Sequence, residues 1–167
     1  MGIALAVRKR ANCSGRKVGA VVVKDNRILS TGYNGTPSKL RNCEGEMGCS
    51  RCASGGFEPG TGYDLCICVH AEQNALLAAA RFGVAVERAQ LYTTLQPCLN
   101  CLKEIIQAGI QGVRYLHPWY LNVSESVRAG VEADRRILET AISRDGFYEQ
   151  LIIDDPEMEW ALGKNKQ

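Results

Sequence analysis

Two short segments of the sequence carry residue types that bind zinc and transfer protons. His70 and Glu72 are separated by one residue, and Cys98 and Cys101 by two, with Pro97 directly before the first cysteine. Imidazole and thiolate groups are common zinc ligands, and three protein ligands leave the fourth tetrahedral position open for water. We therefore predict a catalytic zinc held by His70, Cys98 and Cys101. Glu72 would lie beside the water as a proton carrier.

Both segments precede apolar runs with helical spacing, over 71–82 and 98–108. Helix starts suit this chemistry because the positive end of the helix dipole favours thiolates. The alternative is a noncatalytic zinc module for protein contacts or competence-type DNA handling, because a Cys-x-x-Cys pair alone is often half of a structural site. A closed structural site needs a fourth ligand and no proton carrier, so Glu72 favours an enzyme. The two motifs together are typical of zinc-dependent nucleobase deaminases.

Several further segments resemble the deoxycytidylate (dCMP) deaminase family of the zinc-dependent cytidine deaminase superfamily. The resemblance is carried by residues 17–23, 32–37, 42–43, 70–75, 92–101 and 107–110. It implies a three-layer fold, zinc-dependent hydrolysis of dCMP to dUMP and ammonia, and a homo-oligomer between a dimer and a hexamer. It also implies the same three zinc ligands and proton carrier, and a contact from Asn34 to the nucleotide or to a pyrimidine triphosphate effector.

Contacts to the substrate are harder to assign, because the resemblance gives no motif after residue 117. Candidate substrate contacts are Ala71, Gln96, Lys39, Arg41 and Tyr120. The last three, together with Arg16 and Lys17, are chosen by charge and position alone. Arg81 resembles a position that the family uses at subunit contacts and effector sites, which makes it a candidate interface or effector residue.

Six further cysteines lie within or beside a Gly- and Cys-rich insertion at about 38–68. They are Cys13, Cys43, Cys49, Cys52, Cys66 and Cys68. So long a stretch without apolar periodicity needs support other than a hydrophobic core. We expect four of the six to hold a structural zinc, and the resemblance implies Cys13 and Cys43 among them. Two such sites, or small buried thiols at positions 13, 66 and 68, are the alternatives.

The elements that must position these residues alternate between strands and helices. The pattern predicts helices over 3–11, 71–82, 98–108 and 125–142, strands over 18–23, 27–31, 90–93, 112–116 and 147–153, and a loose helix from 156. An opening hairpin followed by alternating elements predicts an α/β domain with one mixed sheet covered on both faces. With the resemblance, we expect one domain over 1–167, a three-layer α/β/α sandwich around a five-stranded sheet.

The composition indicates the cellular compartment of the protein and the kinds of partner that it binds. No apolar run approaches the roughly 20 residues that span a bilayer, and nothing resembles a secretion signal, so we expect reduced thiols in the cytoplasm. Residues 1–41 contain nine Lys or Arg and one acid within a chain of net charge +2. This segment can attract phosphate, or it is an ordinary solvated surface. We expect a small nucleotide as partner, and neither duplex nucleic acid nor a membrane.

Other amine substrates would use the same metal site. Adenosine in transfer RNA, a riboflavin precursor or a free nucleoside are the rival substrates within the enzyme class. The C-terminal half is not strongly basic, which disfavours an RNA substrate. The Gly-Tyr-Asn-Gly loop at 32–35 and the cysteine-rich insertion favour a nucleotide.

Overall fold

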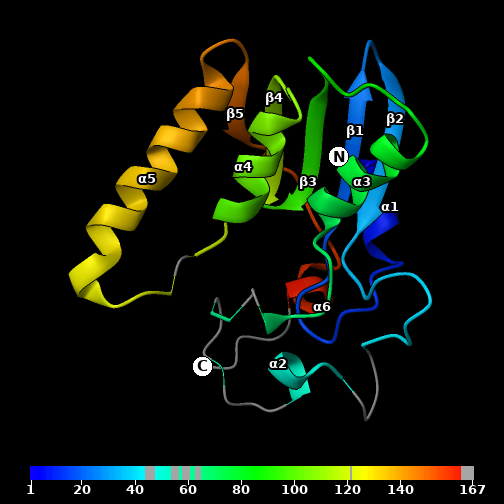
Figure 1. The fold of residues 1–167 in the computed structure, drawn as a ribbon, viewed down its shortest axis with the longest axis vertical. Coiled ribbons are helices and arrows are strands. Elements are labelled where there is room, and N and C mark those ends of the chain that lie inside the picture. Colours follow the sequence, from blue (N-terminus) through cyan, green and yellow to red (C-terminus); the bar gives the residue numbers. More distant parts are fainter. Residues whose placement is uncertain (44–47, 54–56, 58–60, 63–64, 121, 163–167) are drawn as a thin grey trace.

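A mixed sheet of five strands forms the centre of the molecule (Figure 1). The computed structural model describes residues 1–43, 48–53, 57, 61–62, 65–120 and 122–162. The strands are β1 (Gly19–Lys24), β2 (Arg27–Tyr33), β3 (Gln90–Leu95), β4 (Gly112–His117) and β5 (Phe147–Gln150), in the spatial order β2-β1-β3-β4-β5. β1 pairs antiparallel with β2 and β3, whereas β3, β4 and β5 run parallel.

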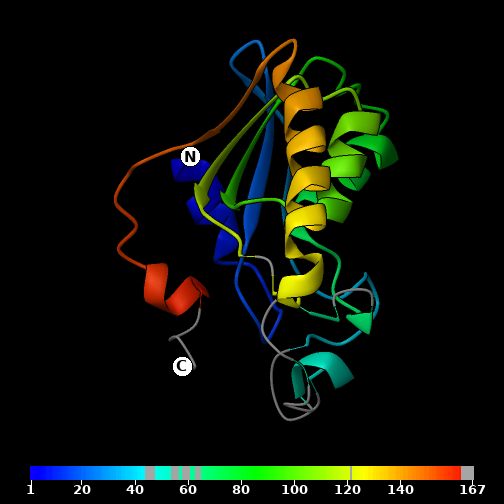
Figure 2. The same cartoon turned by 90° about the vertical axis from the view of Figure 1, so that its left-hand side faces the viewer.

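Helices cover both faces of this sheet (Figure 2). α3 (Ala71–Arg81), α4 (Leu99–Gln107) and α5 (Glu125–Ser143) pack on one face, and α1 (Gly2–Arg8) packs on the other. The short helices α2 (Ser50–Ala53) and α6 (Met158–Leu162) lie outside these layers. The predicted three-layer α/β/α sandwich around a five-stranded mixed sheet is confirmed. Among the described residues, no helix is both long and apolar enough to cross a membrane.

The opening hairpin is confirmed, and its turn explains the register. Asp25 and Asn26 have φ angles of 49° and 60°, and Lys24 pairs with Arg27 across them. Two consecutive positive φ angles are the mark of a two-residue type I′ turn, whose twist matches that of the flanking strands. The hairpin thereby sets the position of β2, the strand on which α3 rests.

A close approach between β2 and α3 fixes where the first predicted motif lies. A Cβ on Gly32 of β2 would collide with the carbonyl oxygen of Ala71 and the amide nitrogen of Ala75. Both alanines are fully buried, and their small side chains let the helix lie directly on the strand. Because the first turn of α3 packs against β2, the N-cap residue of α3, His70, is held at the end of the sheet.

The C-terminal segment is tied to the opposite face by a buried ion pair. The two terminal guanidinium nitrogens of Arg8 donate to the Asp155 carboxylate, at 2.7 and 2.8 Å, and the His117 ring contacts it at 2.7 Å. Arg8 and Asp155 side chains are 1% and 2% exposed. The Arg8 guanidinium holds the pKa of Asp155 well below its usual range, against the opposing effect of burial.

This ion pair also explains a shorter last strand than expected. The strand predicted over 147–153 ends at Gln150, and the Leu151 amide makes one further bond to the Tyr115 carbonyl at 2.8 Å. The chain then leaves the sheet, and Ile152 is 86% exposed. Residues 151–154 therefore act as a connection that brings Asp155 to Arg8.

Candidate metal-dependent active site

The three predicted zinc ligands converge at the starts of α3 and α4. His70 is the N-cap of α3, Cys98 is the N-cap of α4, and Cys101 lies in the first turn of α4. The Nδ1 atom of His70 lies 3.5 Å from the Cys98 sulfur and 3.4 Å from the Cys101 sulfur. A tetrahedral zinc with Zn–S and Zn–N bonds of about 2.3 and 2.0 Å has N···S edges of about 3.5 Å. The donor set and its spacing therefore fit zinc.

Glu72 is buried beside these ligands. It is only 4% exposed, so its carboxyl group is shielded from water. Burial raises the pKa of Glu72 to about 7, although the nearby His70 opposes this shift. A carboxyl with a pKa near neutrality can both accept and return a proton, which is what a general acid–base group must do.

The three ligands and Glu72 shift one another's pKa values, and the hydrogen bond to Cys98 together with burial raises the pKa of Cys101. A hydrogen bond from Cys101, opposed by burial, lowers the pKa of Cys98 to about 4. Burial lowers the pKa of His70, but the Cys98 thiolate and Glu72 outweigh it and raise that pKa to about 9. The site therefore concentrates negative charge around the imidazole, as a cation site requires.

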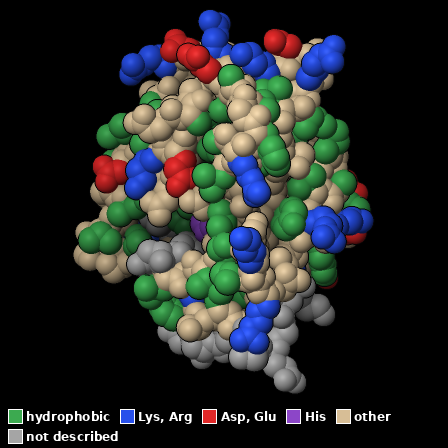
Figure 3. Space-filling model, turned by 45° about the vertical axis from the view of Figure 1, so that its right-hand side comes forward, with side chains coloured by type: hydrophobic (Ala, Val, Ile, Leu, Met, Phe, Trp, Pro, Cys, Tyr) green, Lys and Arg blue, Asp and Glu red, His purple; other side chains and the backbone are tan. Residues whose placement is uncertain are grey.

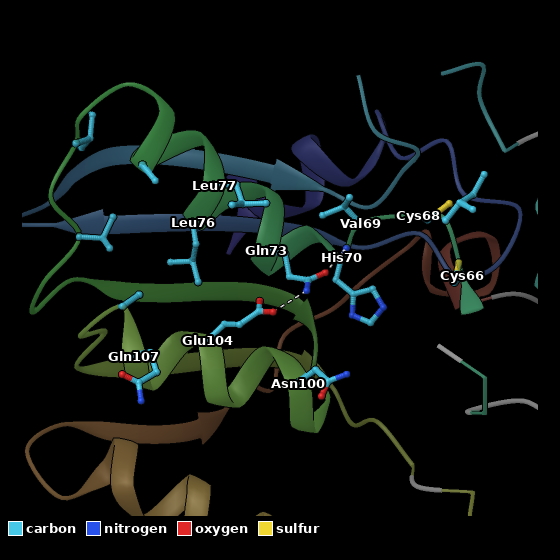
Figure 4. A pocket seen from close by; sticks show the side chains of 15 residues that line it. Cys66, Cys68, Val69, His70, Gln73, Leu76, Leu77, Asn100, Glu104 and Gln107 are labelled. Carbon is cyan, nitrogen blue, oxygen red and sulfur yellow. Dashed lines mark hydrogen bonds between the residues drawn. The ribbon is translucent and has the colours of Figure 1, made fainter. Parts of the chain in front are cut away.

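Gln73 joins the two helices that carry the ligands. Its side-chain oxygen accepts a bond of 2.9 Å from the His70 amide, which closes a capping box at the start of α3. Its side-chain nitrogen donates a bond of 2.8 Å to Glu104 of α4 (Figure 4). The sequence analysis did not single out Gln73. The signal was present, since Gln three residues after an N-cap is a known capping pattern.

A second support comes from α5, and sequence reasoning missed it. Arg135 donates a bond of 3.0 Å to the Pro97 carbonyl and contacts Glu139 at 2.7 Å. The same guanidinium lies over the Trp119 ring, 5.3 Å from its centroid. Gln96, a predicted substrate contact, donates to Glu139 at 3.3 Å and accepts from the Trp119 amide at 3.1 Å. These contacts fix the residues just before Cys98.

Asn34 is buried and its amide group bridges two parts of the backbone. Its Oδ1 accepts a bond of 2.7 Å from the Val18 amide, and its Nδ2 donates a bond of 2.7 Å to the Arg16 carbonyl. It is 8% exposed. In this structure the residue therefore shapes the loop after β2, and its contact with a nucleotide stays a prediction. Ala71, another uncharged candidate, is fully buried at the first position of α3.

The charged candidates lie on the surface. Lys39 and Arg41 are exposed, Lys39 with a φ of 74°, and Tyr120 is 74% exposed. Lys17 donates a bond of 3.2 Å to the Ala11 carbonyl, and Arg16 is half-buried. On the face shown in Figure 3, Lys and Arg side chains are scattered among apolar ones. The contact of the candidate residues with a phosphate stays a prediction.

A groove between α3 and α4 opens onto His70 (Figure 4). Its volume is about 830 Å³, and Leu76, Leu77 and Val84 contribute apolar side chains to it. Leu77 is 59% exposed. Arg81 lies in the last turn of α3, with its guanidinium 5.8 Å from the Phe82 ring centroid.

The six remaining cysteines form a single cluster below the sheet. We call it the thiol cluster, and its members are Cys13, Cys43, Cys49, Cys52, Cys66 and Cys68. All are free thiols. Although burial opposes the shift, hydrogen bonds from the Cys49 amide and Ser14 lower the pKa of Cys43 to about 6. The structure thus brings the six cysteines together, and the structural zinc expected from four of them stays a prediction.

Two helix starts that meet at a His/Cys/Cys site, with a buried glutamate beside it, define the class of zinc-binding deaminases. Residues 1–117 match the family described as the cytidine and deoxycytidylate deaminase zinc-binding region. The chain belongs to this family, in the deoxycytidylate deaminase branch of the cytidine deaminase superfamily.

Named relatives agree with this assignment. The chain is 48% identical over 115 residues to a deoxycytidylate deaminase of Schizosaccharomyces pombe, covering 69% of this chain and 35% of the relative. It is 43% identical over 122 residues to that of Mycobacterium phage D29, covering 69% of this chain and 89% of the relative. The structure of the dCMP deaminase of cyanophage S-TIM5 with dCMP and dUMP has a TM-score of 0.63 at 30% identity. That match covers 90% of this chain and 92% of the phage protein.

Proposed function

We propose that this protein hydrolyses dCMP to dUMP and ammonia. The observation that carries the proposal is the buried Glu72 beside a metal site with three protein ligands, because an open fourth position and a proton carrier are what hydrolytic deamination needs. The substrate class is supported by the S-TIM5 relative, whose structure contains dCMP and dUMP. One water is consumed for each amine released.

The residues around the site would divide the chemistry as follows. Zinc held by His70, Cys98 and Cys101 would lower the pKa of a bound water to about 7 and so provide the nucleophile for C4 of cytosine. Glu72 would accept the proton of that water and pass protons to N3 and to the leaving amine. The backbone N–H of Ala71, at the start of α3, is a candidate donor to a ring oxygen.

We propose that the substrate phosphate is bound by basic residues before position 42, with Tyr120 as a further candidate. Lys39 and Arg41 are the first candidates, followed by Arg16, Lys17 and Tyr120. Charge-assisted bonds to a phosphate are strong, and a site built for them leaves its cations unpaired when the phosphate is absent. Asn34 and Gln96 would position the surrounding loops and remain candidates for direct contact with the nucleotide.

A panel of cytosine compounds tests the substrate. We expect ammonia release from dCMP, and a kcat/KM for deoxycytidine lower by at least about 10²-fold, because unpaired polar groups in a site cost several kcal/mol. Equal kcat/KM for the two compounds would refute phosphate recognition. A preference for dCTP, or activity only on adenosine or a riboflavin precursor, would assign the protein to another branch.

The apolar groove between α3 and α4 supports a homo-oligomer. Leu77 on α3 and Phe82 directly after it are 59% and 76% exposed, and a second copy of the chain would cover them. Arg81 lies between them in sequence, which makes it a candidate contact or effector residue. Light scattering should show a mass of two to six chains, and Leu77→Glu should lower it, whereas Ile137→Glu on α5 should not.

The thiol cluster supports a structural zinc in addition to the catalytic one. We propose that four of its six sulfurs form a tetrahedral site that holds the 38–68 insertion to one domain spanning the chain. All eight cysteines are free thiols, which suits a reducing compartment such as the cytoplasm.

A further inference from the structure

The three residues before β1 lie between Asn34 and the C-terminal helix α6. Asn34 holds one side of this segment, with its Oδ1 2.7 Å from the Val18 amide nitrogen and its Nδ2 2.7 Å from the Arg16 carbonyl oxygen. On the other side, the Lys17 amide donates a bond of 2.6 Å to the Ala161 carbonyl. Alternate peptide groups of the segment thus point to opposite sides, as they do in a β-strand. The segment therefore joins Asn34 to α6.

Asn34 itself lies close to the predicted zinc site. The next residue, Gly35, exchanges two backbone hydrogen bonds with Val69, at 2.8 and 3.1 Å. The carbonyl of the residue before Asn34 accepts a bond of 2.7 Å from the Asn74 side chain in α3. These two partners lie on either side of His70 in the sequence, so Asn34 is held near that ligand.

The bonds to the backbone fix the orientation of the Asn34 amide group and leave part of it available. An asparagine side chain can donate two hydrogen bonds and accept two. Among the residues that the structure describes, the bonds to Val18 and Arg16 use one acceptor and one donor. One N–H and one lone pair remain for a nucleotide. A shift of residues 16–18 would change the direction in which both are presented.

The helix α6 is firmly held where it meets this segment. Ala161 is fully buried, and Leu162 packs against the main hydrophobic core. Before the helix, Asp155 binds Arg8 and accepts a bond of 3.2 Å from the Glu157 amide. Figure 2 shows α6 beyond the end of α1, on the side of the sheet opposite α3. The helix therefore supports the segment from the side away from the predicted zinc site.

We propose that α6 is a positioning element of the nucleotide site, which acts through the backbone bond from Lys17 to Ala161 and through the Asn34 side chain. The role of α6 rests on the proposed function, because it requires that Asn34 contacts the nucleotide. The helix lies outside residues 1–117, which match the family, so the motifs of the site do not indicate this role. Its effect should fall on substrate affinity, because other contacts hold Glu72 and the zinc ligands.

Displacing α6 tests the effect on the substrate. Ala161→Leu puts a larger side chain where the structure leaves no room. We expect KM for dCMP to rise about 10-fold, the scale of one hydrogen bond, with zinc content and kcat unchanged within about twofold. Glu159→Leu adds the same side chain at an exposed position of α6 and should leave KM unchanged. If Ala161→Leu does not fold, Ala161→Gly, which loosens the helix, should raise KM in the same direction.

Two results of this experiment would overturn the proposal. One is a KM for dCMP that is the same in the Ala161 variant and in wild type. The other is a loss of kcat or of zinc without a change in KM, which is what a helix that only completes the fold would give.

A double-mutant cycle shows whether the effect passes through Asn34. Asn34→Ala keeps the backbone bond of 3.2 Å from its own amide to the Val18 carbonyl, so the segment stays paired. This variant should raise KM by itself, and adding Ala161→Leu should raise it little further, because residues that act through one contact are not additive. Independent effects of the two substitutions would exclude Asn34 as the link.

Hydrogen exchange tests the link without any substrate. The Val18 amide is bonded to Asn34, so it should exchange faster in Ala161→Leu than in wild type or in Glu159→Leu. Faster exchange in a protein that does not convert dCMP would refute the proposed function and still support the link from α6 to Asn34. Equal exchange of the Val18 amide in the three proteins would overturn the proposal.

Discussion

Gln73 of α3 and Glu104 of α4 are joined by a hydrogen bond of 2.8 Å, and the other side of the Gln73 amide caps His70 at 2.9 Å. One side chain therefore fixes the orientation of a metal ligand and its distance from the helix that carries the other two. Groups that orient a metal ligand commonly change metal affinity by 10- to 100-fold when they are removed.

Replacing Gln73 should accordingly weaken the catalytic site. Gln73→Ala removes the cap and the bond to Glu104, so we expect zinc affinity at His70 to fall by roughly 10- to 100-fold, with a stability loss of about 1 kcal/mol. Gln107→Ala, at the exposed end of α4, is the matched control. A chelator titration of both variants measures the effect. Equal zinc affinities in the Gln73→Ala and Gln107→Ala variants would show that Gln73 does not position His70.

Arg135 should act on the same site from α5. Arg135→Ala removes the bond to the Pro97 carbonyl and the contact with Trp119, so the residues before Cys98 lose their support. We expect kcat to fall while the fold is retained, because geometry at the reacting centre is sensitive to displacements of about 1 Å. Arg136→Ala, its exposed neighbour, should behave as wild type. A lower kcat in both variants would point to a general effect on α5.

The close packing of α3 on β2 should not tolerate a side chain at position 32. Gly32→Ala places a methyl group against the backbone of Ala71 and Ala75, and we expect a loss of roughly 1–3 kcal/mol in the free energy of unfolding. Gly130→Ala in α5 is the matched control, because a Cβ there meets nothing within 4 Å. It should stabilise by up to about 1 kcal/mol through helix propensity. Denaturant unfolding measures both values.

The Arg8–Asp155 ion pair should make stability depend on acid pH. The folded-state pKa of Asp155 lies below the unfolded value of about 3.9, so its contribution is complete above that value and is lost as the pH falls towards the folded-state pKa. Asp155→Asn should lower stability at neutral pH and flatten its decline on acidification. Asp154→Asn, an exposed neighbour, should leave the profile unchanged. An unaltered acid profile in Asp155→Asn would contradict this assignment.

The chemistry of the site was predictable because its residues are separated by only a few positions within each motif. Each of the four site residues lies within a few positions of a helix start, namely His70, Glu72, Cys98 and Cys101. The helices themselves were evident from their apolar periodicity. The strands of the sheet were also predictable from local sequence, because turns bound them. Gln73 carries a local capping signal and could have been found.

The supporting contacts were not predictable because they join residues far apart in the chain. Arg135 reaches the Pro97 carbonyl from 38 positions away, and Arg8 reaches Asp155 across 147. The early end of β5 follows from that second contact, so a strand pattern alone could not place it. The pairing of sulfurs likewise depends on a three-dimensional arrangement, in which Cys13 meets Cys43 and Cys68.

The most direct test of the account is the turnover of dCMP by wild-type protein and by Glu72→Gln, with zinc content measured on the same samples. The account predicts that wild type forms dUMP and an equal amount of ammonia. It predicts that Glu72→Gln retains the catalytic zinc but loses about 10²- to 10⁴-fold in kcat, the usual contribution of a positioned acid–base group. Unchanged turnover in a zinc-loaded Glu72→Gln variant, or no dUMP from zinc-loaded wild type, would contradict it.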